Sequence, residues 1–166
     1  MILNTLQKVI NRQCDLIILG SMPGMESLRL QQYYAHPRNQ FWRLIYALDG
    51  QVPSDNYAAR LQFALAKGIA LWDVLNECER EGSLDARIQK PVLNDFQRLF
   101  ADFPQVKRVY CNGTTAYDLF KKKAAPILNM NKLSLHLLPS SSPAHTIPFA
   151  DKWIAWKILV NSLEND

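Results

Sequence analysis

The sequence predicts an α/β fold in which helices cover both faces of a parallel sheet. Two observations support this prediction. Four short apolar runs have the composition of strands buried on both faces, and the segments between them repeat apolar residues at helical spacing. Buried strands that alternate with helices are typical of a parallel sheet. The length of 166 residues suits one domain with a substantial core, and no repeat, linker or low-complexity segment divides the chain.

The expected strands are short and end near turn residues; they lie at 16–20 (LIILG), 69–75 (IALWDVL), 108–112 (RVYCN) and 135–139 (LHLLP). The expected helices lie at about 39–48, 57–66, 92–101 and 113–122. A last helix, DKWIAWKILVNSL, is expected to begin near Asp151, because aspartate is a favourable N-cap. The N-terminal stretch, MILNTLQKVINRQCD, also repeats apolar side chains at helical spacing.

Composition excludes several classes of protein. Hydrophobic residues make up 48% of the chain and charged residues 20%, as in a globular protein. No apolar run reaches the roughly 18–20 residues of a membrane span, and the N-terminus does not resemble a signal peptide, so a cytoplasmic location is expected. Cys14, Cys78 and Cys111 lack the spacing of metal ligands or of a disulfide framework, so neither a metal nor a cofactor is expected. The net charge of +4 is compatible with a polyanionic partner.

Candidate site residues follow the expected strands, because ligands of such folds collect outside the carboxyl ends of the strands. These segments are 20–24 (GSMPG), 72–85, 112–118 (NGTTAYD) and 139–146 (PSSSPAHT). In GSMPG the glycines permit a ligand to approach the backbone closely, and proline stiffens the turn. A tight connection between strand and helix would use the same residues, so this segment alone does not distinguish a ligand-binding turn from a plain connection.

The segment PSSSPAHT places Ser140, Ser141 and Ser142 before Pro143. Hydroxyls together with backbone amides can hold phosphate oxygens, and the alternative is a plain serine-rich turn. A serine hydrolase that uses Ser21 or Ser141 with a histidine is a weaker interpretation. The sequence has no G-x-S-x-G turn, and no convincing pair of an acid and a histidine follows.

The segment YYAHPRNQFW, at 33–42, gathers aromatic rings and neutral polar groups around one proline. Pro37 suits the first position of a helix, so Asn39 is expected in the first turn, where free N–H groups lie. Trp42 and the two tyrosines then remain for the wall of a pocket, while Phe41 also contributes an inward-facing ring. The alternative is a core helix in which the asparagine is only a cap.

Taken together and in this order, GSMPG, YYAHPRNQFW and LPSSSPAHT resemble the uracil-DNA glycosylase superfamily, and in particular its hypoxanthine-DNA (deoxyinosine) glycosylase branch. The segments LWDVLNECEREGSLDARI and VYCNGTTAYDLF resemble the same branch, so the likeness covers most of the chain. The resemblance implies a three-layer α/β/α sandwich with a short central parallel sheet, in a single glycosylase domain over residues 1–166. It also implies a monomer that cleaves the N-glycosidic bond of a deaminated base in DNA, for base excision repair. Hypoxanthine is the expected base, and uracil is a second candidate.

The resemblance further implies roles for residues. Asn39 matches the catalytic asparagine of the His-Pro-x-Asn-x-Phe-Trp motif and is expected to orient the attacking water. GSMPG matches the motif that activates water in many relatives, but it carries Ser21 and Met22 where those relatives have aspartate or asparagine. Its backbone amides are instead expected to stabilise negative charge on the leaving base. Aromatic rings stack well on a flipped base. The expected base pocket comprises Gly20, Ser21, Met22, Pro23, Gly24, Tyr34, His36, Phe41, Trp42 and Asp73.

Two further expectations concern polar residues. Asp73 ends the second expected strand, where a carboxylate would accept a hydrogen bond from N1–H of hypoxanthine; a buried helix cap is the alternative. The loop that matches the DNA-gripping motif comprises Ser140, Ser141, Ser142, Pro143, Ala144 and His145. His145 replaces the asparagine expected there. A non-catalytic module that binds nucleotides or damaged DNA remains the main alternative function, because the first motif lacks its acid or amide.

Overall fold

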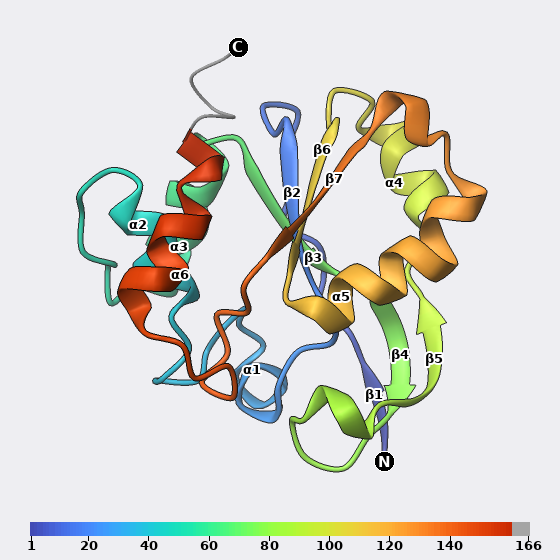
Figure 1. The fold of residues 1–166 in the computed structure, drawn as a ribbon, viewed down its shortest axis with the longest axis horizontal. Helices are drawn as coiled ribbons and strands as arrows, with labels where there is room; N and C mark the ends of the chain where they lie inside the picture. Colours follow the sequence, from blue (N-terminus) through green and yellow to red (C-terminus); the bar gives the residue numbers. More distant parts are fainter. Residues whose placement is uncertain (161–166) are drawn as a thin grey trace.

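The computed structural model of the chain describes residues 1–160, and a parallel sheet lies at its centre. The sheet has the order β3-β2-β6-β7, and all its neighbouring strands are parallel (Figure 1). Its strands are β2 (Leu16–Gly20), β3 (Ile69–Asp73), β6 (Arg108–Asn112) and β7 (Ser134–Leu138). The prediction of a parallel α/β fold is therefore confirmed. Each expected strand lies within one or two residues of the observed one.

A second, antiparallel sheet was not expected. It has the order β1-β4-β5 and consists of β1 (Ile2–Asn4), β4 (Leu75–Glu79) and β5 (Gln89–Leu93). The expected strand 69–75 was too long, because the chain leaves the parallel sheet after Asp73 and enters β4. The helical spacing of the first residues was also misleading, since they form β1 and then a bridge between Val9 and Leu71.

Helices cover both faces of the parallel sheet. One face is covered by α2 (Phe41–Ala47), α3 (Tyr57–Ala66) and α6 (Phe149–Trp156) (Figure 1). The other is covered by α4 (Phe96–Asp102) and α5 (Thr114–Leu119), which continues as a π-helical turn (Phe120–Ala124). The short helix α1 (Met25–Leu30) follows β2, and three 3₁₀ turns complete the chain: Asp85–Arg87, Ala125–Ile127 and Met130–Lys132.

Three helix boundaries differ from the prediction. Helix α4 begins at Phe96 instead of residue 92, because Asp95 caps it by accepting a hydrogen bond from the Arg98 N–H. Helix α6 begins at Phe149, before Asp151, and the expected helical residues 161–163 lie outside the described part of the chain. Helix α2 begins only at Phe41, so the expected start at residue 39 was too early.

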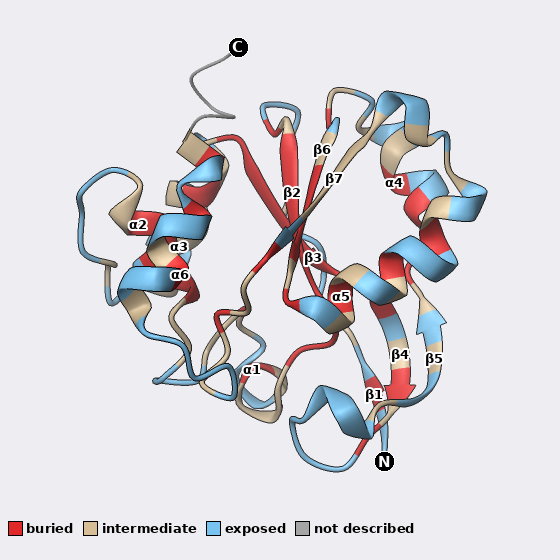
Figure 2. Ribbon diagram, viewed as in Figure 1, coloured by how far each residue is buried: buried red, intermediate tan, exposed pale blue. Residues whose placement is uncertain are grey.

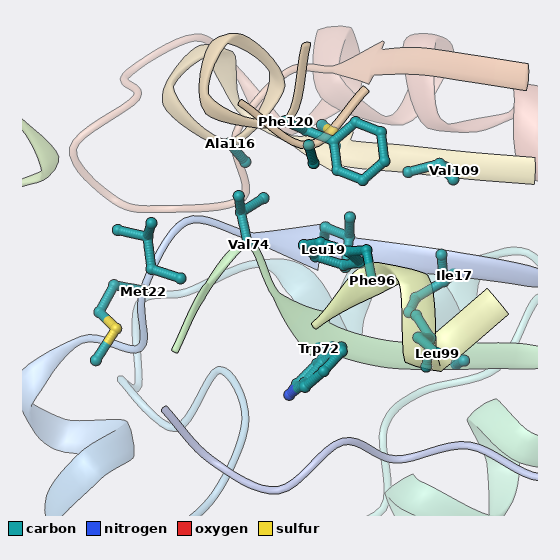
Figure 3. Packing of buried hydrophobic residues seen from close by; sticks show 14 of the residues in the cluster. Ile17, Leu19, Met22, Trp72, Val74, Phe96, Leu99, Val109, Ala116 and Phe120 are labelled. Carbon is teal, nitrogen blue, oxygen red and sulfur yellow. The ribbon is translucent and has the colours of Figure 1, made fainter. Parts of the chain in front are cut away.

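The core lies on both faces of β2, whose residues are all buried (Figure 2). Side chains alternate along a strand, so Ile17 and Leu19 pack toward α4 and α5 beside Phe96 and Phe120 (Figure 3). Leu16 and Ile18 pack toward the opposite helices together with Trp156. Each fully buried apolar side chain contributes about 1.5–3 kcal/mol, so the two faces together hold the sheet between its helices.

Helix α6 is fixed to the segment after β7 through Trp156. The indole is fully buried, its edge contacts the Phe41 ring at 5.8 Å between centroids, and its Nε1–H donates to the Pro139 carbonyl at 2.9 Å. Helix α6 therefore holds the start of the serine-rich loop in place.

We predict that Trp156→Phe lowers the free energy of unfolding by about 2–3 kcal/mol, because it leaves a cavity and an unpaired Pro139 carbonyl. Trp153→Phe is the matched control on the same helix; Trp153 is only half-buried, and a loss below about 1 kcal/mol is expected. Urea denaturation of both variants measures the difference. Equal losses would show that the Trp156 hydrogen bond does not anchor the loop.

Candidate functional site

A cavity of about 320 Å³ opens at the carboxyl ends of the parallel strands. The strands β2, β3 and β6 end there in Gly20, Asp73 and Asn112. The expected site residues that line this cavity are Gly20, Ser21, Met22, Pro23, Gly24, Tyr34, His36, Asn39, Asp73, Ser140, Ser141, Ser142, Pro143, Ala144 and His145. The fold therefore brings together three segments that are far apart in the sequence.

The floor of the cavity is formed where Asp73 meets Gly20, its partner in the register of β2 and β3. A Cβ atom on residue 20 would lie 2.5 Å from Asp73 Oδ1, so only glycine permits this approach. Asp73 is 4% exposed, and the Thr5 hydroxyl donates to its Oδ2 at 3.2 Å. Burial raises the pKa of the Asp73 carboxyl to about 7, although the Thr5 hydrogen bond opposes the rise. Asp73 is followed by β4 and not by a helix, so the helix-cap alternative was wrong.

Tyr34 lies beside this carboxyl. Its backbone is in the left-handed region with φ 55°, and its buried hydroxyl makes no hydrogen bond of good geometry to residues 1–160. The Tyr34 ring stacks on Phe41 at 3.8 Å between centroids, and Phe41 is fully buried. Trp42 is buried as well, and its Nε1–H donates to the Tyr33 carbonyl at 3.0 Å. Phe41 and Trp42 therefore lie behind Tyr34 and not in the cavity wall, which corrects the expected base pocket.

Asn39 lies in a turn before α2, and not in the first turn of that helix. Its N–H donates to the His36 carbonyl at 2.9 Å across Pro37, which favours such a turn. Its Oδ1 accepts a hydrogen bond from the Phe41 N–H at 2.9 Å, so the side chain does satisfy the helix start. The Asn39 Nδ2 donates to no group in residues 1–160, and the residue lines the cavity. A capping role and a role in the cavity are thus compatible.

The serine-rich loop is held by Asn112, which the sequence analysis did not single out. Asn112 Nδ2 donates to the Ser141 hydroxyl, and the Ser141 N–H donates to Asn112 Oδ1, both at 2.9 Å. The Gln40 N–H donates to the Ser141 carbonyl, which joins this loop to the segment that carries Asn39. Ser141 is 0% exposed, so its hydroxyl does not reach a phosphate as expected. The signal for Asn112 was its position at the end of the expected strand 108–112 and the start of the candidate segment 112–118.

The loop between β4 and β5 also lines the cavity, through Ser83, Leu84 and Asp85. The Ser21 hydroxyl donates to Asp85 Oδ1 at 2.7 Å. Burial raises the pKa of the Asp85 carboxyl, while hydrogen bonds from Ser21 and Thr115 and the charge of Arg80 oppose the rise. The sequence analysis included this region in the segment 72–85 but identified no functional residue in the loop.

Other chemistries find little support in the described residues. Neither Ser21 nor Ser141 is hydrogen-bonded to a histidine within residues 1–160, which argues against a serine hydrolase. No group of three or more His, Cys, Asp or Glu side chains in that range is arranged to hold a metal ion. None of the helices described there is both long and apolar enough to span a membrane.

Comparisons with known proteins agree with this geometry. A family model described as the uracil DNA glycosylase superfamily matches residues 7–159. A Methanosarcina barkeri protein named hypoxanthine DNA glycosylase is 36% identical over 149 residues, which cover 89% of this chain and 91% of that protein. A Methanosarcina acetivorans protein of the same name is 36% identical over 138 residues, covering 82% and 84%.

The fold comparison gives the same result. A solution NMR structure of a Methanosarcina acetivorans protein, described as a uracil DNA glycosylase, has a TM-score of 0.84 and 33% identity, and the match covers 99% of each chain. The match thus includes the second, antiparallel sheet as well as the parallel one. Both the sequence and the fold show that the chain belongs to the uracil DNA glycosylase superfamily.

Proposed function

We propose that this chain is a DNA glycosylase that hydrolyses the N-glycosidic bond between hypoxanthine and deoxyribose in DNA. The observation that carries the proposal is the cavity itself, whose floor combines a tyrosine with a buried carboxyl at the ends of the parallel strands. Its volume of about 320 Å³ is in the range of small-molecule sites. The names of the Methanosarcina relatives support the choice of hypoxanthine. Uracil, a smaller base, is the second substrate to test.

A base in a duplex reaches such a cavity only after it has been flipped out of the stack. Tyr34 then offers an aromatic surface, and stacking on an aromatic side chain is worth about 1–3 kcal/mol per base. Asp73 lies on the cavity floor, where it can contact the hydrogen-bonding edge of the base. Because burial keeps this carboxyl protonated up to a pH of about 7, it acts as a hydrogen-bond donor to the O6 atom of hypoxanthine. This reading replaces the charged acceptor expected from the sequence.

Cleavage of the glycosidic bond moves its electron pair onto the base and leaves a cationic sugar. A neutral Asp73 stabilises the growing negative charge on the base, whereas a carboxylate there would oppose it. Asn39 holds the attacking water beside the sugar through its side-chain amide, which carries no charge. Water oxygen then adds to the sugar carbon, and the base leaves with a proton. Placement of the water is enough, because the cationic sugar reacts readily with a weak nucleophile.

The loop 140–145 is proposed to contact the DNA backbone. Ser142 and His145 are the members suited to this role, because Ser141 is buried and bonded to Asn112. The Ser142 carbonyl accepts hydrogen bonds from the His145 N–H and from Lys152 Nζ, which fix the shape of the loop. The net charge of +4 favours binding to a polyanion. The open cavity mouth is consistent with a monomer.

The proposal is tested with duplexes that carry one deoxyinosine or one deoxyuridine and an end label. The purified chain is mixed in excess over DNA, and hot alkali then breaks the strand at abasic sites. Strand breaks at the inosine in the presence of EDTA are expected. Tight binding to the same duplex without any break would instead support the non-catalytic binding module, which the Met22 side chain in the first motif favours.

We predict that Asn39→Ala lowers the single-turnover rate by about 10²-fold or more, the scale of a positioned catalytic group. Binding of inosine-containing DNA is expected to change little. The variant also loses the hydrogen bond to the Phe41 N–H, so about 1–2 kcal/mol of stability is lost. Asn56→Ala is the matched control, since Asn56 caps α3 in the same manner, away from the cavity. A reduced single-turnover rate in Asn56→Ala, or a wild-type rate in Asn39→Ala, would contradict the assignment of Asn39 as the residue that positions the water.

We predict that the rate of hypoxanthine removal falls as the pH rises through about 7, because Asp73 then loses the proton that it donates. The rate is expected to fall with rising pH because the active form of Asp73 is the protonated one. The raised pKa means that this form predominates below a pH of about 7 and is lost above it. Asp73→Asn retains an N–H donor, so its rate is expected to be independent of pH in this range. Single-turnover rates between pH 5.5 and 9 (roughly 1.5–2 units either side of the value) measure this. A wild-type rate that rises with pH across 7 would show that Asp73 acts as a charged acceptor.

We predict that His145→Ala weakens DNA binding about tenfold and changes the single-turnover rate at saturating enzyme by less than about threefold, as expected for a backbone contact. Ser141→Ala is the contrasting variant. It removes the hydroxyl that accepts from Asn112 Nδ2 inside the protein and leaves the bond from the Ser141 N–H to Asn112 Oδ1, so it is expected to lower the melting temperature instead. Titration of a fluorescent inosine duplex measures both affinities. Unchanged affinity in His145→Ala would remove the loop from the proposed DNA interface.

A further inference from the structure

We propose that Asp85 is a second catalytic side chain, whose carboxylate faces the cationic sugar while Asn39 holds the water. The inference deepens the proposed glycosylase function and rests on it. Asp85 lies outside GSMPG and LPSSSPAHT, in the segment LWDVLNECEREGSLDARI, and the resemblance assigns it no role. It reaches the cavity from the loop between β4 and β5, in the 3₁₀ turn Asp85–Arg87.

The loop that carries Asp85 is fixed against the GSMPG turn at three points. The buried Arg80 guanidinium donates to the Pro23 carbonyl at 2.6 Å, and the Met25 N–H donates to the Ser83 hydroxyl at 2.9 Å. The third point is the hydrogen bond of 2.7 Å from Ser21 to Asp85 itself. The residue is exposed as a whole, yet its carboxyl group is held at the cavity and cannot swing freely. Preorganised charges of this kind contribute most to catalysis.

The cavity has two levels, and Asp85 is on the outer one. Asp73 and the Tyr34 hydroxyl are buried at the floor, whereas Asp85, His36 and His145 are exposed residues at the rim. A flipped base enters with its hydrogen-bonding edge foremost, so the edge meets the floor. The sugar and its bond to the base then lie at the rim. Asp85 is an exposed residue whose carboxyl is bonded to Ser21, so we place it nearer to the sugar than Asp73 is.

Of the acidic residues that line the cavity, we assign the stabilisation of the sugar cation to Asp85. The carboxylates that line the cavity are Glu26, Asp73 and Asp85. Glu26 is already paired with Arg29 at 2.5 Å, and Asp73 is neutral up to a pH of about 7. Asp85 accepts a neutral hydrogen bond from Ser21 at 2.7 Å, so in its ionised form it is the carboxylate of the three best placed to offset a positive sugar. The Ser21 hydrogen bond joins Asp85 to the GSMPG turn, in which Met22 stands where the resemblance leads us to expect an acid or an amide. In this chain the negative charge beside the sugar is therefore supplied by the loop between β4 and β5.

The chemistry balances with water as the only co-reactant. The bond between sugar and base breaks, and its electron pair goes to the base, which takes up a proton from solvent. The sugar carbon becomes cationic, and the Asp85 carboxylate stabilises it electrostatically. The water on Asn39 adds its oxygen to this carbon, and the proton that it loses passes to Asp85 and then to solvent.

The test compares Asp85→Asn with Glu81→Gln. The asparagine can still accept the Ser21 hydrogen bond, so the loop stays anchored while the charge is lost. Glu81 is an exposed carboxylate on the same loop that does not line the cavity, so Glu81→Gln removes the same charge elsewhere. For each variant, the single-turnover rate, the affinity for an inosine duplex and the melting temperature are measured.

Asp85→Asn is expected to reduce the single-turnover rate by about 10²-fold, with an unchanged melting temperature and an affinity that is equal or higher. An equal or higher affinity follows because the variant removes a negative charge that repels DNA. Glu81→Gln is expected to cleave like the wild type. A purely structural role for Asp85 would instead lower stability and affinity together and leave the rate of bound DNA intact.

The pH profile supplies a second readout. The groups that act on the Asp85 carboxyl are Arg80, Asp73, Ser21 and Thr115, and burial raises its pKa above the ordinary value. The wild-type rate should therefore decline on the acidic side as this carboxylate is protonated, and Asp85→Asn should lose that decline. An Asp85→Asn variant with the wild-type rate and profile would overturn the inference. If the wild type itself cleaves no inosine duplex, the proposed function fails instead, so the two failures are distinguishable.

Discussion

The close approach of the Asp73 carboxyl to Gly20, which leaves no room for a Cβ atom at residue 20, is the constraint on which the site depends. The parallel register of β2 and β3 places the two residues side by side, and any larger residue at 20 would collide with the carboxyl. The chain also changes direction directly after Asp73. The Val74 N–H donates to the Gly20 carbonyl, and the next residues leave the parallel sheet for β4. The cavity floor therefore lies where the chain leaves the parallel sheet for the second sheet. The loop between β4 and β5 of that second sheet then brings Asp85 to the cavity.

The site is assembled mainly by hydrogen bonds between segments that are distant in the sequence. Asn112 holds the serine-rich loop through Ser141, and the Ser141 carbonyl in turn holds the turn beside Asn39 through the Gln40 N–H. The two bonds between Asn112 and Ser141 are partly buried, and an unmade hydrogen bond in such a place is costly. The arrangement leaves the polar atoms at the rim free to meet a ligand. Rigid connections below a polar rim suit a site that must place a water and a base accurately.

The parallel sheet was predictable because β2, β3 and β6 are mainly apolar runs that end in glycine or a polar residue, and the run in β7 is followed by Pro139. The antiparallel sheet was not, since LNECE and QKPVL are short and show no regular alternation of burial, and Pro91 weakens the strand signal further. Order and spacing of the motifs located most of the cavity lining. The motifs did not distinguish Tyr34, which faces the cavity, from Phe41 and Trp42, which lie behind it. A short aromatic-rich segment does not show which of its rings point into a cavity. Asp85 lies in a polar loop without periodicity, so only the three-dimensional structure reveals its neighbours.

The first strand has a practical consequence for handling the protein. β1 pairs with β4, the Thr5 hydroxyl that follows it reaches the Asp73 carboxyl, and the N-terminal ammonium lies 3.5 Å from Glu81 on the loop that carries Asp85. An affinity tag or fused domain attached to Met1 would emerge beside that loop and compete with these contacts. β1 and Thr5 thus support the cavity floor from outside the segments that line the cavity.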